Sequence, residues 1–197
     1  MKEQNHRGLI ITEFILYIFI IIFVIFFKSI TPNYYKWVIT HYRDTMFVYP
    51  TISERFLAGL NLDILSDKTY NIAQMLTNGL MNIVSFVPFG ALLYHLSSKA
   101  KLFRAVMISL AFSSLVEIVQ LITVIGGFGI KDIIANVFGG FLGACIMALI
   151  SKVRLGNKIT RTILIALIFT TAIALTYFMR NAFMHFDAYI NILTRNI

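Results

Sequence analysis

Residues 131–150 read KDIIANVFGGFLGACIMALI, and this stretch decides the class of fold. Only its first two residues are charged, and it is about as long as an α-helix must be to cross the roughly 30 Å hydrocarbon core of a bilayer. Gly139 and Gly143 are four residues apart, a spacing of small residues that lets two membrane helices approach closely. The stretch therefore predicts a transmembrane helix with one tightly packed face.

Four further apolar runs of similar length surround this stretch, at residues 8–27, 79–97, 102–125 and 162–179. The chain of 197 residues is 58% hydrophobic and only 13% charged, a composition that excludes the wettable surface of a soluble globule. A segment in lipid must satisfy its own backbone hydrogen bonds, which favours helices. We predict an all-α fold, a polytopic bundle of about five transmembrane helices forming a single membrane domain over residues 1–197.

The cationic residues beside the predicted spans indicate an orientation. Nine lie in short segments that alternate with one another along the chain: Lys2, Arg7, Lys99, Lys101, Arg104, Lys152, Arg154, Lys158 and Arg161. The opposite short segments hold three: Lys131, Arg180 and Arg195. Because cationic flanks are retained in the cytoplasm, we expect the N-terminus inside and the C-terminus outside the cell, in a multi-pass protein of the plasma membrane.

This topology also accounts for the net charge of +8, so we expect no nucleic-acid partner. The single cysteine, Cys145, forms no intrachain disulfide, and we expect neither a metal nor a cofactor. Residues 28–78 form the predicted outer loop. A short helix along the outer surface is expected from its apolar residues Phe56, Leu57, Leu60, Leu62, Ile64 and Leu65. Glu13, near the inner end of the first span, is expected to reach the interface.

The second span carries polar residues and a proline. Asn82 and Ser85 are three residues apart and share a helical face. A polar side chain in hydrocarbon costs free energy unless it faces protein or water, so this face is a candidate binding surface. Pro88 and Gly90 are interpreted as a kink and a close helix contact.

The third span presents Ser113, Glu117 and Gln120 on one face. Glu117 is its one carboxylate, and two readings stay open. The residue either holds the bundle together, protonated or paired with a cation such as Lys131, or it serves a bound ligand.

The fourth span repeats this pattern with Asp132, Asn136 and Gly140 at intervals of four. Asp132 either caps the helix or binds a ligand, and Asn136 either joins helices or binds a ligand. Gly139, Gly140 and Gly143 supply the packing face. Since the second and fourth spans run inward and the third outward, we expect the polar faces to line one pocket in the outer half of the bilayer.

Three motifs in this order carry a resemblance to a known family. They are Asn82-Ile-Val-Ser-Phe-Val-Pro-Phe-Gly90, Glu117-Ile-Val-Gln120 and Asp132-Ile-Ile-Ala-Asn136-Val-Phe-Gly-Gly140. Over about residues 61–150 the chain resembles the VanZ-like family of bacterial membrane proteins. The resemblance implies a small multi-span protein of the cell envelope, linked in its founding example to low-level resistance to the glycopeptide teicoplanin.

Three functions stay open at this point. The first is a protein without enzymatic activity that binds a lipid, a lipid-linked envelope precursor or a lipophilic drug at the outer leaflet. The second is an intramembrane enzyme acting on a lipid-linked substrate, with Glu117 as general acid or base. It is weakened because the sequence shows no Ser-His pair, phosphate-binding glycine loop or His/Cys ligand set. The third is a flippase or transporter, for which a homo-oligomer would supply the symmetry that a single chain lacks.

Overall fold

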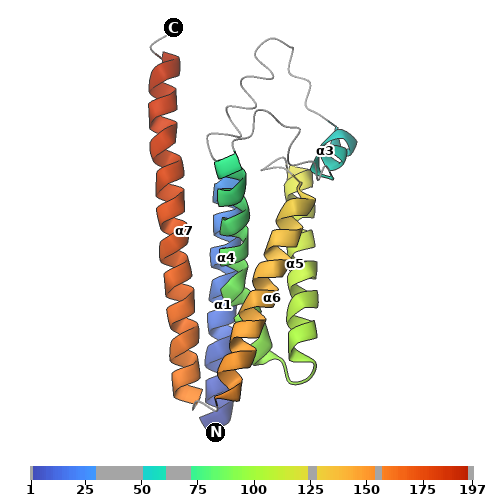
Figure 1. The fold of residues 1–197 in the computed structure, drawn as a ribbon, viewed down its shortest axis with the longest axis vertical. Coiled ribbons are helices and arrows are strands. Elements are labelled where there is room, and N and C mark those ends of the chain that lie inside the picture. Colours follow the sequence, from blue (N-terminus) through green and yellow to red (C-terminus); the bar gives the residue numbers. More distant parts are fainter. Residues whose placement is uncertain (1, 30–50, 61–71, 124–127, 154–156, 195–197) are drawn as a thin grey trace.

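The computed structural model describes residues 2–29, 51–60, 72–123, 128–153 and 157–194, and this part of the chain is built of helices. Five long helices run side by side: α1 (Lys2–Ser29), α4 (Ile72–Leu96), α5 (Lys101–Thr123), α6 (Ile130–Lys152) and α7 (Asn157–Thr194) (Figure 1). The short helix α3 (Ile52–Gly59) lies at one end of the bundle, beside the ends of α5 and α6 (Figure 1). The predicted all-α fold is confirmed.

Four of the predicted spans correspond to helices that are long and apolar enough to cross a membrane. These segments are Gly79–Leu96, Lys101–Thr123, Ile130–Lys152 and Lys158–Tyr177. The first predicted span, residues 8–27, lies within α1, which is 28 residues long. The last helix, α7, is longer than predicted and has 38 residues. Residues 157–194 contain no glycine or proline, so no helix-breaking residue ends the helix after the apolar run.

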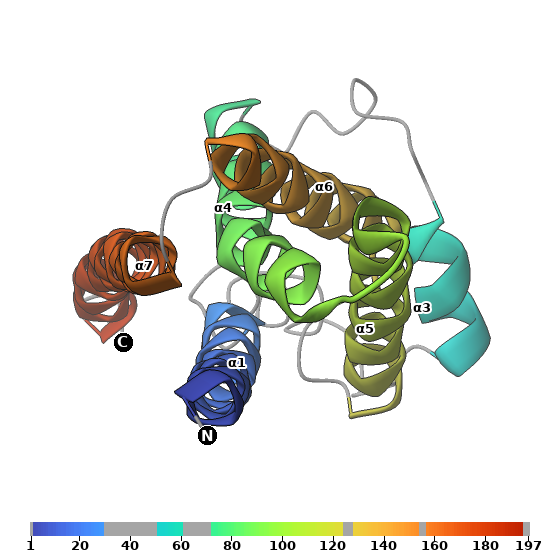
Figure 2. The same cartoon turned by 90° about the horizontal axis from the view of Figure 1, so that it is seen from below.

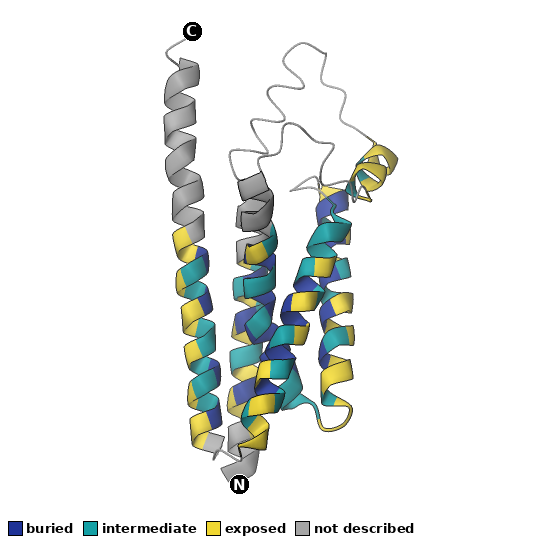
Figure 3. Cartoon of the chain, viewed as in Figure 1, coloured by how far each residue is buried: buried dark blue, intermediate teal, exposed yellow. Residues whose placement is uncertain are grey.

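Helix α4 is central and contacts α1, α5, α6 and α7 (Figure 2). Its buried Phe86 and Phe89 form an aromatic core with Phe112 of α5, and Phe89 stacks on Phe14 of α1 with ring centroids 5.4 Å apart. The hydroxyl of Tyr17 in α1 donates a hydrogen bond to the Ser85 carbonyl, 2.7 Å away, in the turn before Pro88. Exposed residues lie along the outward faces of the helices (Figure 3). Many of the exposed residues are large and apolar, which suits a lipid environment.

Helices α4 and α6 approach closely along a row of glycines. Gly139 packs on the backbone of Ile83, Gly143 on that of Val87, and Gly90 of α4 on that of Gly140. A Cβ atom at Gly90, Gly139 or Gly143 would overlap the backbone of the facing helix. These glycines therefore set the distance between the two helices that carry most of the polar residues.

The helix expected in the outer loop begins earlier than its apolar residues suggest. Thr51 caps α3, and its side chain and that of Glu54 exchange hydrogen bonds with each other's backbone N–H. This capping box starts the helix at Ile52. Phe56 and Leu57 lie in α3 and Leu60 follows it, whereas Leu62, Ile64 and Leu65 lie outside the described residues.

Candidate functional site

Polar side chains from α4, α5 and α6 meet near the α3 end of the bundle, where α4 and α6 begin and α5 ends (Figure 1). We call this set the polar cluster and define it as Asn82, Ser113, Glu117, Asp132 and Asn136. Asn82, Ser113, Glu117 and Asn136 are buried, and Asp132 is half-buried. Three cross-helix contacts hold the cluster together.

The first contact joins α4 to α6. The Asn82 Nδ2 donates a hydrogen bond to Asp132 Oδ1 at 2.5 Å. Asp132 lies in the first turn of α6, where the positive end of the helix dipole favours a carboxylate. Its side chain therefore links two helices in addition to sitting at a helix start.

The second contact brings the Glu117 carboxylate of α5 to the beginning of α6. Glu117 is only 2% exposed, and its Oε2 accepts a hydrogen bond from the backbone N–H of Gly129 at 2.7 Å. Gly129 is the N-cap residue of α6 and has no side chain of its own to cap the helix. A carboxylate from the neighbouring helix thus accepts from the N-cap N–H, the donor that a Glu or Gln at the third helical position binds in a capping box.

The third contact lies one turn deeper. Asn136 Nδ2 of α6 donates to the Ser113 Oγ of α5 at 2.9 Å, and both side chains are buried. Together the contacts bring Asn82, Glu117, Asp132 and Asn136 into one place, as the helix directions led us to expect. That a ligand binds there stays a prediction.

Two further predicted site residues, Ser85 and Gln120, are buried but are not part of the polar cluster as defined above. The Ser85 hydroxyl donates to the Met81 carbonyl of its own helix at 2.6 Å, so this contact does not reach α5 or α6. Gln120 is buried on the same face of α5 as Ser113 and Glu117. Within the described part of the chain, no group of three or more His, Cys, Asp or Glu residues is arranged to hold a metal ion.

Sequence reasoning missed an ion pair at the other end of the bundle. Glu13 was expected to reach the interface, which stays a prediction, and its Oε1 pairs with the Arg161 Nε of α7 at 2.7 Å. The Glu13 side chain is 14% exposed, and its Oε2 is buried without a hydrogen-bond partner among the described residues. The pair joins α1 to α7 across 148 positions of sequence, a separation that no local pattern reveals.

Arg55 of α3 was also missed. Its Nε and Nη1 are buried and have no hydrogen-bond partner in the described part of the chain, although the residue belongs to a short surface helix. The signal that would have located it is Thr51-x-x-Glu54, the capping-box pattern, which starts a helix and places Arg55 and Gly59 on one face.

The sequence model of the VanZ/LLP1 family matches residues 14–151 of the chain. The chain belongs to the VanZ/LLP1 family. A curated relative, Protein VanZ of Enterococcus faecium, is 34% identical over 100 residues, which is 49% of this chain. The match spans 60% of that relative's length. No solved structure matches the chain.

The range matched by the VanZ/LLP1 family begins earlier than the segment that carried the resemblance, residues 61–150. It includes the whole polar cluster and also Arg55. It excludes both partners of the ion pair, Glu13 and Arg161. The polar cluster thus belongs to the VanZ/LLP1 part of the chain, whereas the ion pair lies outside it.

Proposed function

We propose that this VanZ/LLP1 protein binds the headgroup of a membrane lipid or of a lipid-linked envelope precursor with its polar cluster. One observation carries the proposal: two carboxylates and two carboxamides from three helices meet at one end of a bundle of membrane-length helices. Polar groups are rare inside such helices, and carboxylates at membrane depth are costly unless they serve a partner. Neutral side chains would hold the helices together at a lower cost.

The chemistry of the polar cluster suits a polar headgroup. The carboxylates of Glu117 and Asp132 accept hydrogen bonds, and the carboxamides of Asn82 and Asn136 both donate and accept them. Hydroxyl and amine groups are the donors that lipid headgroups and lipid-linked sugars carry. A ligand of this kind would enter from the end of the bundle, with its acyl chains against the apolar outer faces of the helices.

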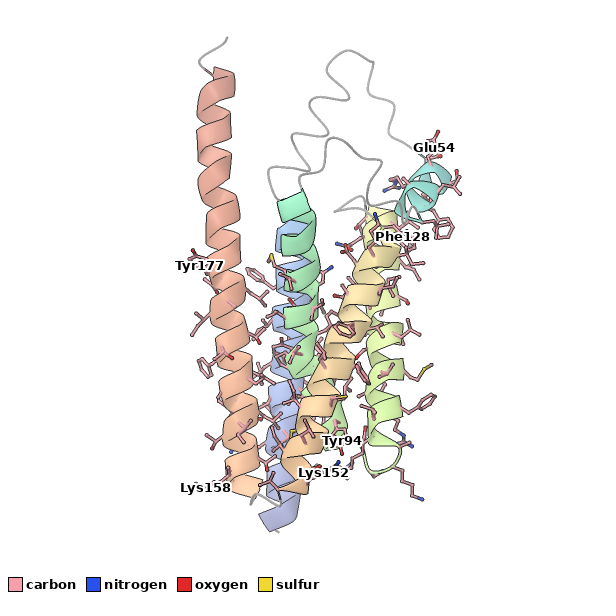
Figure 4. The ribbon with its side chains drawn as sticks, viewed as in Figure 1. Glu54, Tyr94, Phe128, Lys152, Lys158 and Tyr177 are labelled. Atoms are coloured by element: carbon pink, nitrogen blue, oxygen red, sulfur yellow. The ribbon has the colours of Figure 1, made fainter. Side chains whose placement is uncertain are left out.

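The distribution of charge supports an outward-facing cluster in the plasma membrane. Lys152 and Lys158 lie at the end opposite Glu54 and Phe128 (Figure 4). Arg7, Lys99 and Lys101 begin or precede helices at that same end (Figure 1). By the positive-inside rule this end is cytoplasmic, so the polar cluster faces the outer leaflet. Envelope precursors and glycopeptide antibiotics meet on that side, and we propose that the protein contributes to glycopeptide resistance.

The test is glycopeptide susceptibility in a deletion strain that is complemented with wild type or with variants, after the amount of each in the membrane has been measured. We expect the deletion to raise susceptibility, wild type to restore resistance, and Glu117→Ala and Asp132→Ala to fail. Thr162→Ala is the matched control because its hydroxyl bonds only the Lys158 carbonyl of its own helix. Equal susceptibility with and without the gene would contradict the resistance role.

The same strains separate binding from catalysis. Glu117→Gln replaces the carboxylate by a carboxamide, which still forms hydrogen bonds but cannot transfer a proton. We expect Glu117→Gln to retain part of the resistance that Glu117→Ala loses, because a binding role needs polar contacts only. Complete loss in Glu117→Gln at normal abundance would instead favour proton transfer by this residue.

A further inference from the structure

Arg55 presents a cation that the described residues leave without a counter-ion. Its Nε and Nη1 are buried, and neither has a hydrogen-bond partner within residues 2–29, 51–60, 72–123, 128–153 and 157–194. The neighbouring carboxylate, Glu54, is occupied: its Oε2 accepts from the Thr51 backbone N–H at 2.7 Å and from the Thr51 hydroxyl at 2.9 Å. Arg55 as a whole is half-buried, but two of its three guanidinium nitrogens are shielded from solvent. Buried cationic N–H groups are expected to be paired, so these unpartnered nitrogens indicate an anionic ligand.

The position of α3 brings this cation to the end of the polar cluster. The Phe56 ring packs on the Phe128 ring with centroids 5.1 Å apart, and Gly59 lies against the backbone of Phe128 (Figure 4). Arg55 and Gly59 are four residues apart and share the face of α3 that meets Phe128. Phe128 directly precedes Gly129, whose N–H binds Glu117. The Arg55 guanidinium therefore lies at the end of the bundle that holds the Glu117 and Asp132 carboxylates.

The surface of α3 indicates where the anion comes from. Ile52, Phe56, Leu57 and Leu60 are exposed, an apolar surface on a short helix at the end of a transmembrane bundle. Helices of this kind lie at the level of the lipid headgroups. At that level the abundant anion is phosphate, and a guanidinium binds phosphate through paired N–H donors.

We infer that Arg55 binds the phosphate of the lipid headgroup whose hydroxyl or amine groups contact the polar cluster. This inference rests on the proposed function and makes it more specific: the ligand is a phosphate-bearing lipid. The cation contacts the phosphate, and the Glu117 and Asp132 carboxylates accept from the donors beyond it. A neutral lipid without phosphate would contact only the Glu117 and Asp132 carboxylates.

The experiment measures binding to the full chain in a phosphate-free detergent. The probes are short-chain phosphatidylglycerol, diacylglycerol with the same chains, and inorganic phosphate. Wild type should prefer phosphatidylglycerol over diacylglycerol by at least about tenfold, as expected for charge-assisted hydrogen bonds. Arg55→Gln should lose this preference, and Arg55→Lys should keep part of it because lysine retains the charge but not the fork of donors. Arg104→Gln, at an exposed arginine on the first turn of α5, is the matched control and should bind as wild type does.

Several outcomes overturn the inference. One is an Arg55→Gln variant that melts at the wild-type temperature and keeps the preference. If that variant melts lower, Arg55→Lys decides: partial retention of the preference supports the inference, and a loss equal to that in Arg55→Gln contradicts it. Inorganic phosphate binding as tightly as phosphatidylglycerol would make the site one for a free anion, against a lipid source. Wild type binding neither lipid would contradict the proposed function itself. Binding of both lipids that weakens in Glu117→Ala but is unchanged in Arg55→Gln would overturn only the role of Arg55.

Discussion

Gly143→Ala changes one hydrogen to a methyl group at the closest approach of α4 and α6. The added Cβ would overlap the Val87 carbonyl oxygen, and it would lie 2.7 Å from the Val87 carbonyl carbon and 2.9 Å from the Ala91 nitrogen. Since the best separation of such atoms is about 3.5–4.0 Å, the helices must move apart by about 1 Å, which forfeits a quarter to a half of the dispersion energy at the contact.

We expect the repacking to cost about 1–3 kcal/mol, offset by up to about 1 kcal/mol from the better helix propensity of alanine. With the full offset, the free energy of unfolding falls by about 0–2 kcal/mol relative to wild type, and by about 1–3 kcal/mol relative to a glycine-to-alanine control that gains the same propensity without the overlap. The assay is reversible unfolding in mixed micelles, followed by circular dichroism. Gly79→Ala is the matched control, because a Cβ at Gly79 of α4 meets nothing within 4 Å. Equal stability of Gly143→Ala and Gly79→Ala would refute the close contact of α4 with α6.

Three further changes test other parts of the structure. Ala100 has φ 46°, in the left-handed region, so Ala100→Gly should raise the free energy of unfolding by up to about 1 kcal/mol in the same assay. Glu13→Gln should lower the free energy of unfolding by about 1 kcal/mol. The double variant that exchanges the two charges, Glu13→Arg with Arg161→Glu, should recover most of that loss, and no recovery would exclude a direct pair. Hydrogen bonds from the Thr51 backbone N–H, and then from its hydroxyl, lower the pKa of Glu54 in the folded protein below its ordinary value of 4.5. The stabilisation of α3 by Glu54 is therefore fully present above the pKa of the unfolded chain, and it is lost as the pH falls through the lower pKa of the folded protein. Amide exchange in α3, corrected for intrinsic rates, should speed up at those low pH values in wild type and show no such pH dependence in Glu54→Gln.

The arrangement of the spans could be predicted because it follows from local patterns. Apolar length locates the helices, and intervals of three and four residues place Asn82, Glu117 and Asn136 on defined faces. The alternating direction of consecutive spans then brings those faces to the same end. The glycine spacing from Gly139 to Gly143 similarly points to a close helix contact, and the structure places that contact against α4.

What could not be predicted depends on the partner of each face. The sequence does not show that Glu117 reaches the start of α6, or that Tyr17 of α1 bonds the Ser85 carbonyl. The pairing of Glu13 with Arg161 depends on α1 lying beside α7. These are the first and last helices of the chain, so no short loop between them predicts that they are neighbours. Arg55 was hidden for a different reason: its significance comes from the absence of a partner for its buried nitrogens, and only a folded chain reveals that.

The most direct test of the central claim is to map where a lipid headgroup lies on the protein. A phospholipid with a photoreactive group on its headgroup is cross-linked to the full chain in nanodiscs, and the labelled peptides are identified by mass spectrometry. We predict labels at the end of α5 and the beginning of α6, near Gly129 and Asp132, that compete with unlabelled lipid and decrease in Asp132→Ala. The claim that the polar cluster binds a lipid headgroup would be contradicted by labels that lie only on the outward apolar faces, such as those around Phe103 and Phe169, and that Asp132→Ala does not change.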